Sequence, residues 1–220
     1  MKILLPFVAA AMALAMPETP AAAEAHPPIA GYDFGQKSLA KSPLTLADLE
    51  SLKATMLFTD DDVSALRQSK PILADQTDAI LDVWYGFVAA TPQLVQFFSD
   101  PKTGKPDGAY LAAVRKRFAQ WILDTADANY DQAWLDWQYE IALRHNKLKK
   151  NKTDGAASTA QINYRYIPAL TIPVTTTLKP FLAKKGATQV DVDKMHAAWV
   201  KSVLLQTILW GQPYVRDGEF

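Results

Sequence analysis

The chain has 220 residues, of which 49% are apolar and 21% charged, which is enough for one globular domain with a short appendage. This composition excludes intrinsic disorder, a collagen repeat and a protein with many membrane-spanning helices. Equal numbers of basic and acidic residues, 23 each, argue against general nucleic-acid binding, and the absence of cysteine excludes disulfides and thiolate metal sites.

The amino terminus has the pattern of a secretory signal peptide. An uncharged apolar run covers residues 3–17 and is followed by small residues that match the small-x-small cleavage rule. We therefore predict a signal peptide over residues 1–25, cleaved after Ala23 or Ala25. The alternative, an uncleaved membrane anchor, is disfavoured because the run is short and Pro6 interrupts it. The mature protein is expected to be periplasmic or secreted, without membrane attachment.

The remaining chain reads as a series of helices. Residues 26–43 are rich in Pro, Gly, Ser and Lys without helical periodicity, and they predict an irregular N-terminal loop. From residue 44 onward apolar residues recur every three or four positions, which is typical of amphipathic helices. The predicted helices cover residues 44–58, 59–90 with a kink or break at Pro71, 91–98, 110–125, 131–145, 160–182 with bends at Pro168 and Pro173, and 190–210.

Two segments between these helices need comment. Residues 146–159 predict a polar loop whose basic residues complement the carboxyl end of the preceding helix: Lys147, Lys149, Lys150 and Lys152. Residues 171–178 are β-branched and are compatible with a strand, but we assign them to a helix because nothing else in the chain indicates a sheet. The sequence therefore predicts an all-α domain of seven or eight helices.

His145 is the histidine that stands out. Positions four, eight and eleven residues before it are Ile141, Trp137 and Trp134, so the imidazole ends an apolar and aromatic stripe on its helix. Two interpretations are open, a core histidine satisfied by one hydrogen bond or an axial ligand to haem. The other histidines, His26 and His196, are weaker candidates.

Tyr85 is the second polar side chain of interest, since it is in register with Leu81 and Val88 on an apolar helix face. Its hydroxyl either reaches a carbonyl group or water, as in most buried tyrosines, or donates to a ligand in a pocket. The carboxylates do not form a pair in apolar surroundings, and no nucleophile elbow or paired His motif is present. Hydrolase and zinc-site interpretations are therefore disfavoured.

Several local sequences together resemble the protoglobins, a branch of the globin superfamily related to the sensor domain of globin-coupled sensors. The resemblance covers nearly the whole mature chain and implies a globin domain over residues 44–220, with an additional N-terminal helix and the N-terminal loop. The segments that carry it are GYDFG (31–35), DVWYGFV (82–88), YLAAVRKRF (110–118), WILDT (121–125), YDQAWLDWQYEIALRH (130–145), YRY (164–166) and KPFLAKKG (179–186).

The resemblance also implies a set of site residues. His145 matches the proximal histidine, the fifth ligand of a noncovalently bound haem b. Trp84 and Tyr85 match the distal pair that faces bound gas, with Tyr85 as the hydrogen-bond donor, and Arg117 is a candidate partner of a haem propionate. The other residues expected around the porphyrin are Val114, Phe118, Trp137, Ile141, Leu170 and Val174.

Two positions depart from the family pattern: Leu170 stands where relatives carry phenylalanine, and Trp137 where they carry tyrosine. The first change removes bulk above the iron, so we expect easier ligand entry. The resemblance further implies that residues 31–35 belong to an extension over the haem edge, and that two copies form a homodimer through the last two helices. A signal peptide is unusual among these relatives, which are typically intracellular.

The function implied is reversible binding of diatomic gases (O2, CO, NO) for gas binding or sensing. The alternative is a haem enzyme that acts on NO, nitrite or peroxide, and the sequence does not separate the two because both need the same iron, histidine and distal phenol. A helical domain that has lost haem is a third and weaker alternative.

Overall fold

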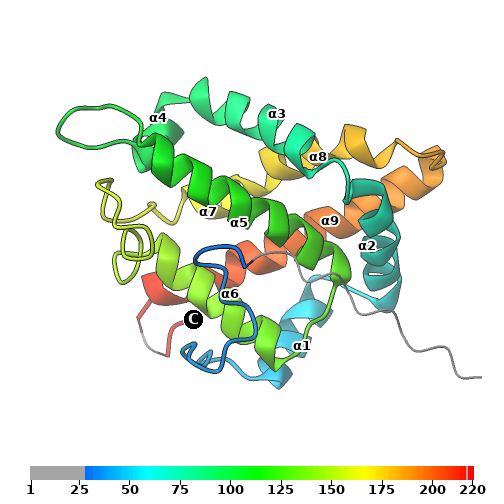
Figure 1. The fold of residues 1–220 in the computed structure, drawn as a ribbon. Helices are drawn as coiled ribbons and strands as arrows, with labels where there is room; N and C mark the ends of the chain where they lie inside the picture. Colours follow the sequence, from blue (N-terminus) through cyan, green and yellow to red (C-terminus); the bar gives the residue numbers. More distant parts are fainter. Residues whose placement is uncertain (1–27, 217) are drawn as a thin grey trace, which may run out of the picture.

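The structure is a computed structural model and describes residues 28–216 and 218–220, so the predicted signal peptide lies outside the described residues. Within the described part the regular secondary structure is helical, apart from one isolated bridge between Ser99 and Pro106. The all-α prediction is thus confirmed (Figure 1). The α-helices are α1 (Leu46–Thr55), α2 (Asp60–Leu73), α3 (Thr77–Ala89), α4 (Pro92–Val95), α5 (Gly108–Asp127), α6 (Gln132–His145), α7 (Tyr166–Ala169), α8 (Thr171–Leu182) and α9 (Gln189–Leu209), and two short 3-10 helices are η1 (Gln96–Phe98) and η2 (Gln212–Tyr214).

Polar residues fix the start of the long helices. The side chain of Asp107 accepts a hydrogen bond from the Tyr110 N–H at 3.0 Å at the start of α5. Asp131 accepts from the Trp134 N–H at 2.8 Å at the start of α6, and Thr188 caps α9. These side chains satisfy N–H groups that have no partner inside the helix. The start of α6 also fixes which residues of that helix face inward.

The predicted division near Pro71 is present, although the helix does not end at the proline itself. α2 continues through Pro71 to Leu73, and α3 begins at Thr77. Proline has no N–H group for the hydrogen bond to the preceding turn, which weakens a helix at this point. The chain therefore changes direction within three residues of it.

The helix predicted over residues 160–182 is wrong in its first part. Residues 160–165 are not helical, because they cross the carboxyl end of α6, where the Ile162 N–H donates to the His145 carbonyl oxygen at 2.9 Å. Helical structure starts with the single turn of α7, and Pro168 and Pro173 each occupy the third position of a helix, where no N–H partner is required. The β-branched residues 171–178 are helical, as predicted.

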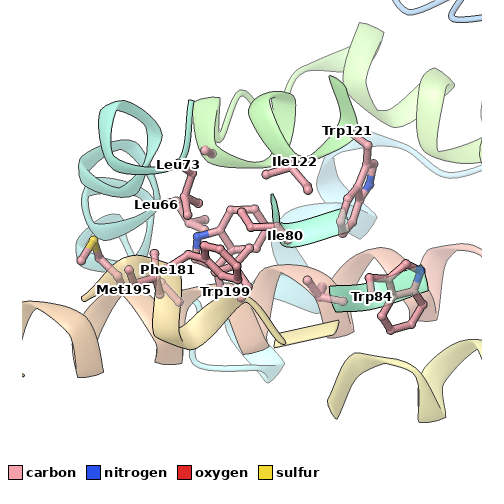
Figure 2. Close-up of a cluster of buried hydrophobic side chains, with 14 of the residues drawn as sticks. Leu66, Leu73, Ile80, Trp84, Trp121, Ile122, Phe181, Met195 and Trp199 are labelled. Atoms are coloured by element: carbon pink, nitrogen blue, oxygen red, sulfur yellow. The ribbon is translucent and has the colours of Figure 1, made fainter. Parts of the chain in front are cut away.

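The core consists of a large and a small cluster. The large one joins α2, α3, α5, α8 and α9, and Figure 2 shows Leu66, Phe181 and Met195 around Trp199, with Trp84 and Trp121 at the other end. Trp199 is fully buried, and its indole N–H donates to Ser69 Oγ at 2.9 Å. The small cluster joins α1, α6 and the end of α9 through Leu49, Trp134, Leu135, Leu205 and Leu209.

The arrangement of α5 and α6 leaves space between them. α5 packs on α2 and α3, whereas α6 packs on α9 and η2 at the other side of the molecule (Figure 1). The functional cavity described below lies between these two groups of helices. Among the described residues, no helix combines the length and apolar character that crossing a bilayer requires.

Candidate functional site

A cavity of about 250 Å³ lies among α3, α5, α6, α7, α8 and the end of α9. This volume far exceeds that needed for one water, about 10–15 Å³, and the wall is mostly aromatic and aliphatic, as in sites for large organic ligands. The structure places all ten residues that the sequence nominated on this wall: Trp84, Tyr85, Val114, Arg117, Phe118, Trp137, Ile141, His145, Leu170 and Val174.

His145 occupies the last turn of α6 and is the only histidine on the described cavity wall. Its Nδ1 lies 2.8 Å from the carbonyl oxygen of Ile141. Because a carbonyl oxygen can only accept, Nδ1 must carry the proton. In the neutral ring Nε2 then carries the lone pair, which is the arrangement of a histidine that ligates a metal through Nε2.

The surroundings of His145 favour this neutral form. Burial lowers the pKa of the imidazole from its usual 6.5 to about 4, and the positive charge of Lys150 acts in the same direction. The ring of Trp210 stacks on the imidazole with a centroid distance of 4.9 Å and an angle of 19°. The indole N–H of Trp210 donates to Gln138 Oε1 at 2.9 Å, which fixes the stacking partner. The imidazole is therefore held in orientation as well as in protonation state.

Tyr85 brings a hydroxyl group to the cavity from α3. The hydroxyl oxygen is buried and forms no hydrogen bond with any described residue, and burial raises the pKa of the phenol. A buried hydroxyl without a partner is destabilising unless another molecule supplies one. This feature favours a ligand that accepts a hydrogen bond inside the cavity.

Trp84 and Phe118 form an aromatic wall beside Tyr85. Their rings meet edge to face, with centroids 5.9 Å apart, and Trp84 rather than Tyr85 lies on the fully buried face of α3 together with Leu81 and Val88. On α5, Tyr110, Val114, Phe118 and Trp121 line the cavity at the three- and four-residue spacing of one helix face. α5 therefore contributes a continuous apolar wall.

Arg117 lies at the rim of the cavity, where it is already paired with a carboxylate. Its guanidinium donates to both carboxylate oxygens of Asp154, at 3.0 and 2.6 Å, and to the carbonyl oxygen of Ala30 at 3.1 Å. This bidentate geometry is the strongest form of such a pair. Arg117 thus joins α5 to the loop after α6 and to the N-terminal segment.

The N-terminal segment covers the cavity between α5 and α6. Tyr32 lines the cavity, packs edge to face on Trp137 at 4.8 Å between ring centroids, and donates its hydroxyl to the carboxylate of Asp124 on α5. Arg144 on α6 donates to the Gly31 carbonyl oxygen and to Asp33. Residues 29–34, which we call the N-terminal strap, thus contact both helices.

Several cavity residues were not nominated from the sequence. Trp210 and Tyr32 contact the site from opposite ends of the chain, and their contacts follow no local spacing. Tyr110 had a detectable signal, because it shares the helix face of Val114 and Phe118. Lys150 lies in the loop predicted over residues 146–159, but the burial of its side chain in the cavity wall has no local sequence signal. Trp134 of the predicted stripe packs in the small core cluster instead of the cavity.

The helical arrangement around a cavity with one buried histidine defines the class of the molecule as a globin-type all-α protein. A structure similar to this one is the globin domain of the Geobacter sulfurreducens globin-coupled sensor, with a TM-score of 0.57 and 14% sequence identity over 76% of this chain and 97% of that chain. The protoglobin family model matches residues 45–220, and the chain belongs to the protoglobin family. No curated protein matches the sequence.

Membership in a globin family implies haem binding in general, together with gas binding or sensing. The residues of this cavity fit such a group in three respects. His145 offers Nε2 as an iron ligand, the buried hydroxyl of Tyr85 has no partner in the described chain, and the wall is apolar with cationic residues at its rim.

Proposed function

We propose that this protein binds haem b noncovalently through His145 and uses it to bind diatomic gases (O2, CO, NO) reversibly. The observation that carries the proposal is that His145 lines the cavity with its Nδ1–H donated to the Ile141 carbonyl oxygen, which leaves a neutral imidazole with the lone pair on Nε2. A core histidine with a purely structural role would make the same single hydrogen bond, so the ligand role is favoured by the cavity of about 250 Å³ that His145 lines and by the Tyr85 hydroxyl, which has no partner among the described residues.

Haem supplies a protein-held iron that binds diatomic ligands. The chain's own residues would supply the axial ligand of the iron, a hydrogen-bond donor for the gas and a site that excludes water. His145 on α6 would hold the haem iron through Nε2, and the Tyr85 hydroxyl on α3 would donate a hydrogen bond to the gas. Trp84, Phe118 and Leu170 exclude water from the space beside Tyr85. Exclusion of water strengthens the Tyr85 hydrogen bond, since the local dielectric is low.

The shape of the pocket follows from Leu170 and Val174, which pack on the main core at the junction of α7 and α8. Leucine is smaller than the phenylalanine expected at that position from the family pattern. A leucine fills less of the space beside the distal aromatic residues than a phenylalanine would, and we propose that gases reach the cavity more easily here than in relatives with the bulkier residue. This proposal concerns rates of ligand entry, not equilibrium affinity.

The cellular setting is a further part of the proposal. The apolar run at residues 3–17 and the small residues after it support export and removal of residues 1–25, which gives a periplasmic or secreted haem protein. We also propose a homodimer that packs through α8 and α9, which rests on the resemblance to the protoglobins. Haem would then have to be supplied outside the cytoplasm.

The test is an absorption spectrum of the mature protein with haem, in the oxidised, reduced and CO-exposed states. We expect a Soret band that shifts on reduction and again with CO, and we expect His145→Ala to lose the reduced and CO spectra of a histidine-ligated haem. His196→Ala is the matched control, because His196 lies on α9 outside the cavity wall. Identical spectra for His145→Ala and the unmodified protein would refute the assignment.

A further inference from the structure

Lys150 is a buried cation in the wall of the cavity. The residue lies five positions after the end of α6, and only 4% of it is exposed. The ammonium group donates to the Phe97 carbonyl oxygen at 2.9 Å, to Ser158 Oγ, and to Asn151 Oδ1 at 3.3 Å. All three acceptors are neutral. The hydrogen bonds of Lys150 are therefore satisfied while its charge is not.

The other cations around the cavity differ in this respect. Arg117 pairs with Asp154 at 2.6 Å, and Lys149 pairs with Glu140 at 2.6 Å. Arg144 pairs with Glu140 at 2.8 Å and with Asp33 at 2.6 Å. Among the residues that the structure describes, no carboxylate forms an ion pair with Lys150. A buried charge without an opposite charge is costly, even where its hydrogen bonds are made.

Two local features reduce that cost without removing it. The ammonium lies 5.3 Å from the centre of the Tyr110 ring, which provides a cation–π contact. Burial lowers the pKa of Lys150 to about 8, so the group still carries most of its charge at pH 7. The described protein groups around the ammonium are neutral. An anion inside the cavity would therefore balance its charge.

We propose that Lys150 binds a carboxylate of the molecule that occupies the cavity, which for the proposed haem is a porphyrin propionate. This inference rests on the proposed function and assigns a residue other than Arg117, whose guanidinium is already paired with Asp154 on both oxygens. The contact with Asn151 is the longest of the three that Lys150 makes, and it is the one that the carboxylate replaces.

The first experiment compares two porphyrins that differ only in the carboxylates, haem and iron protoporphyrin dimethyl ester. Lys150→Met should weaken haem binding about 10- to 100-fold, the range for one hydrogen bond to a charged group, and leave binding of the diester unchanged. Lys150→Arg should keep the preference for haem. Lys152→Met is the matched control, because Lys152 lies in the same loop but is exposed and outside the cavity wall. Equal weakening of both porphyrins, or of neither, would overturn the inference.

A second measurement uses the unmodified protein and does not depend on the folding of a variant. The pKa of Lys150 is followed by NMR of the labelled side chain in the free protein, with zinc protoporphyrin and with its dimethyl ester. A carboxylate beside the ammonium should raise this pKa with the diacid but not with the diester, and the same pKa in both complexes contradicts the inference.

The two proposals fail in different ways. If the unmodified protein binds neither porphyrin, both proposals are wrong. If it gives a haem spectrum that depends on His145 while Lys150 responds to neither test, the proposed function stands and only the role of Lys150 is overturned.

Discussion

His145 is acid-sensitive in a way that follows from its burial. The pKa of His145 is about 4 in the folded protein and 6.5 when the imidazole is exposed. Between these pH values the imidazole is therefore protonated in the unfolded chain but neutral in the folded one. Above pH 6.5 the imidazole is neutral in both states and does not reduce the free energy of unfolding of the haem-free protein. As the pH falls toward 4, this free energy decreases by up to about 3 kcal/mol because of His145.

This prediction is checked by urea unfolding at pH 7, 5.5 and 4 of the haem-free protein and of His145→Gln, which does not titrate. The difference in unfolding free energy between the two proteins isolates His145 from the carboxylates that titrate in the same range. A difference that is independent of pH would show that the imidazole is protonated or solvated in the folded state.

Tyr85→Phe is expected to separate ligand binding from folding. The hydroxyl has no partner in the described chain, so its removal should leave the stability of the haem-free protein unchanged or slightly higher. With haem bound, loss of one hydrogen bond of about 1.5–3 kcal/mol should speed O2 dissociation roughly 10- to 100-fold.

Stopped-flow measurement of O2 dissociation tests this expectation, with Tyr110→Phe as the control because Tyr110 is a second tyrosine of the same cavity. An unchanged rate in Tyr85→Phe would assign the donor role to Trp84 or to water. Loss of stability in the haem-free variant would show instead that the hydroxyl has a partner inside the protein.

At the residue scale the sequence was most informative where a side chain belongs to a helical stripe. Spacing on one helix identified His145 with Ile141 and Trp137, and resemblance to the protoglobins added positions on α3, α5 and α8 and at the junction of α7 and α8. The stacking of Trp210 on His145 and the burial of Lys150 could not be predicted, because both depend on where distant segments meet.

At the scale of elements, the N-terminal strap requires a glycine at position 31, where the backbone is left-handed and a side chain would meet close neighbours. Gly31 has a φ of +73°, and a Cβ there would lie 2.6 Å from Thr153 Cγ2 and 3.0 Å from the guanidinium of Arg117. Gly35 has a similar φ of +76°, but a Cβ there would meet nothing within 4 Å. The two positions therefore share the backbone cost of an alanine and differ in the close contact.

Gly35→Ala is expected to lower the free energy of unfolding by about 1–2 kcal/mol, the cost of a left-handed conformation. Gly31→Ala should cost about 1 kcal/mol more, because Arg117 is held by Asp154 and cannot move away freely. Denaturant unfolding of the two variants measures the difference. Equal losses would show that the strap shifts without resistance.

The success of the sequence at the scale of elements varied with the kind of signal. The helix starts predicted at residues 131 and 190 lie within one residue of those of α6 and α9, where the capping side chains of Asp131 and Thr188 are close in sequence to the N–H groups that they satisfy. Residues 160–165 follow a helical pattern but are not helical. The N–H group of Ile162 instead donates to the carbonyl oxygen of His145 at the end of α6. A local pattern carries no information about such a long-range partner.

For the whole molecule, the cavity links folding to haem. A ligand that binds only the folded chain stabilises it by mass action, by about 2.7 kcal/mol when the free ligand is 100-fold above its dissociation constant. Haem should therefore raise the melting temperature measured by circular dichroism, and His145→Ala should show a smaller rise at the same haem concentration. No rise in the unmodified protein would indicate that haem does not occupy the cavity of the folded state.

The all-α class and the order of the helices followed from the sequence, whereas the position of the cavity did not. The position of the cavity depends on α6 packing against α9 and η2 instead of against α5. The small core cluster around Leu49, Trp134 and Leu209 holds α6 in that position. No periodicity records which two helices remain apart.

The hydrogen bond from Ile162 to the carbonyl group of His145 ties the end of α6 to a segment that returns 17 residues later. The intervening loop is closed at its base on the same residue that carries the imidazole. The main-chain position of that residue is consequently held both by the last turn of α6 and by the returning segment at Ile162.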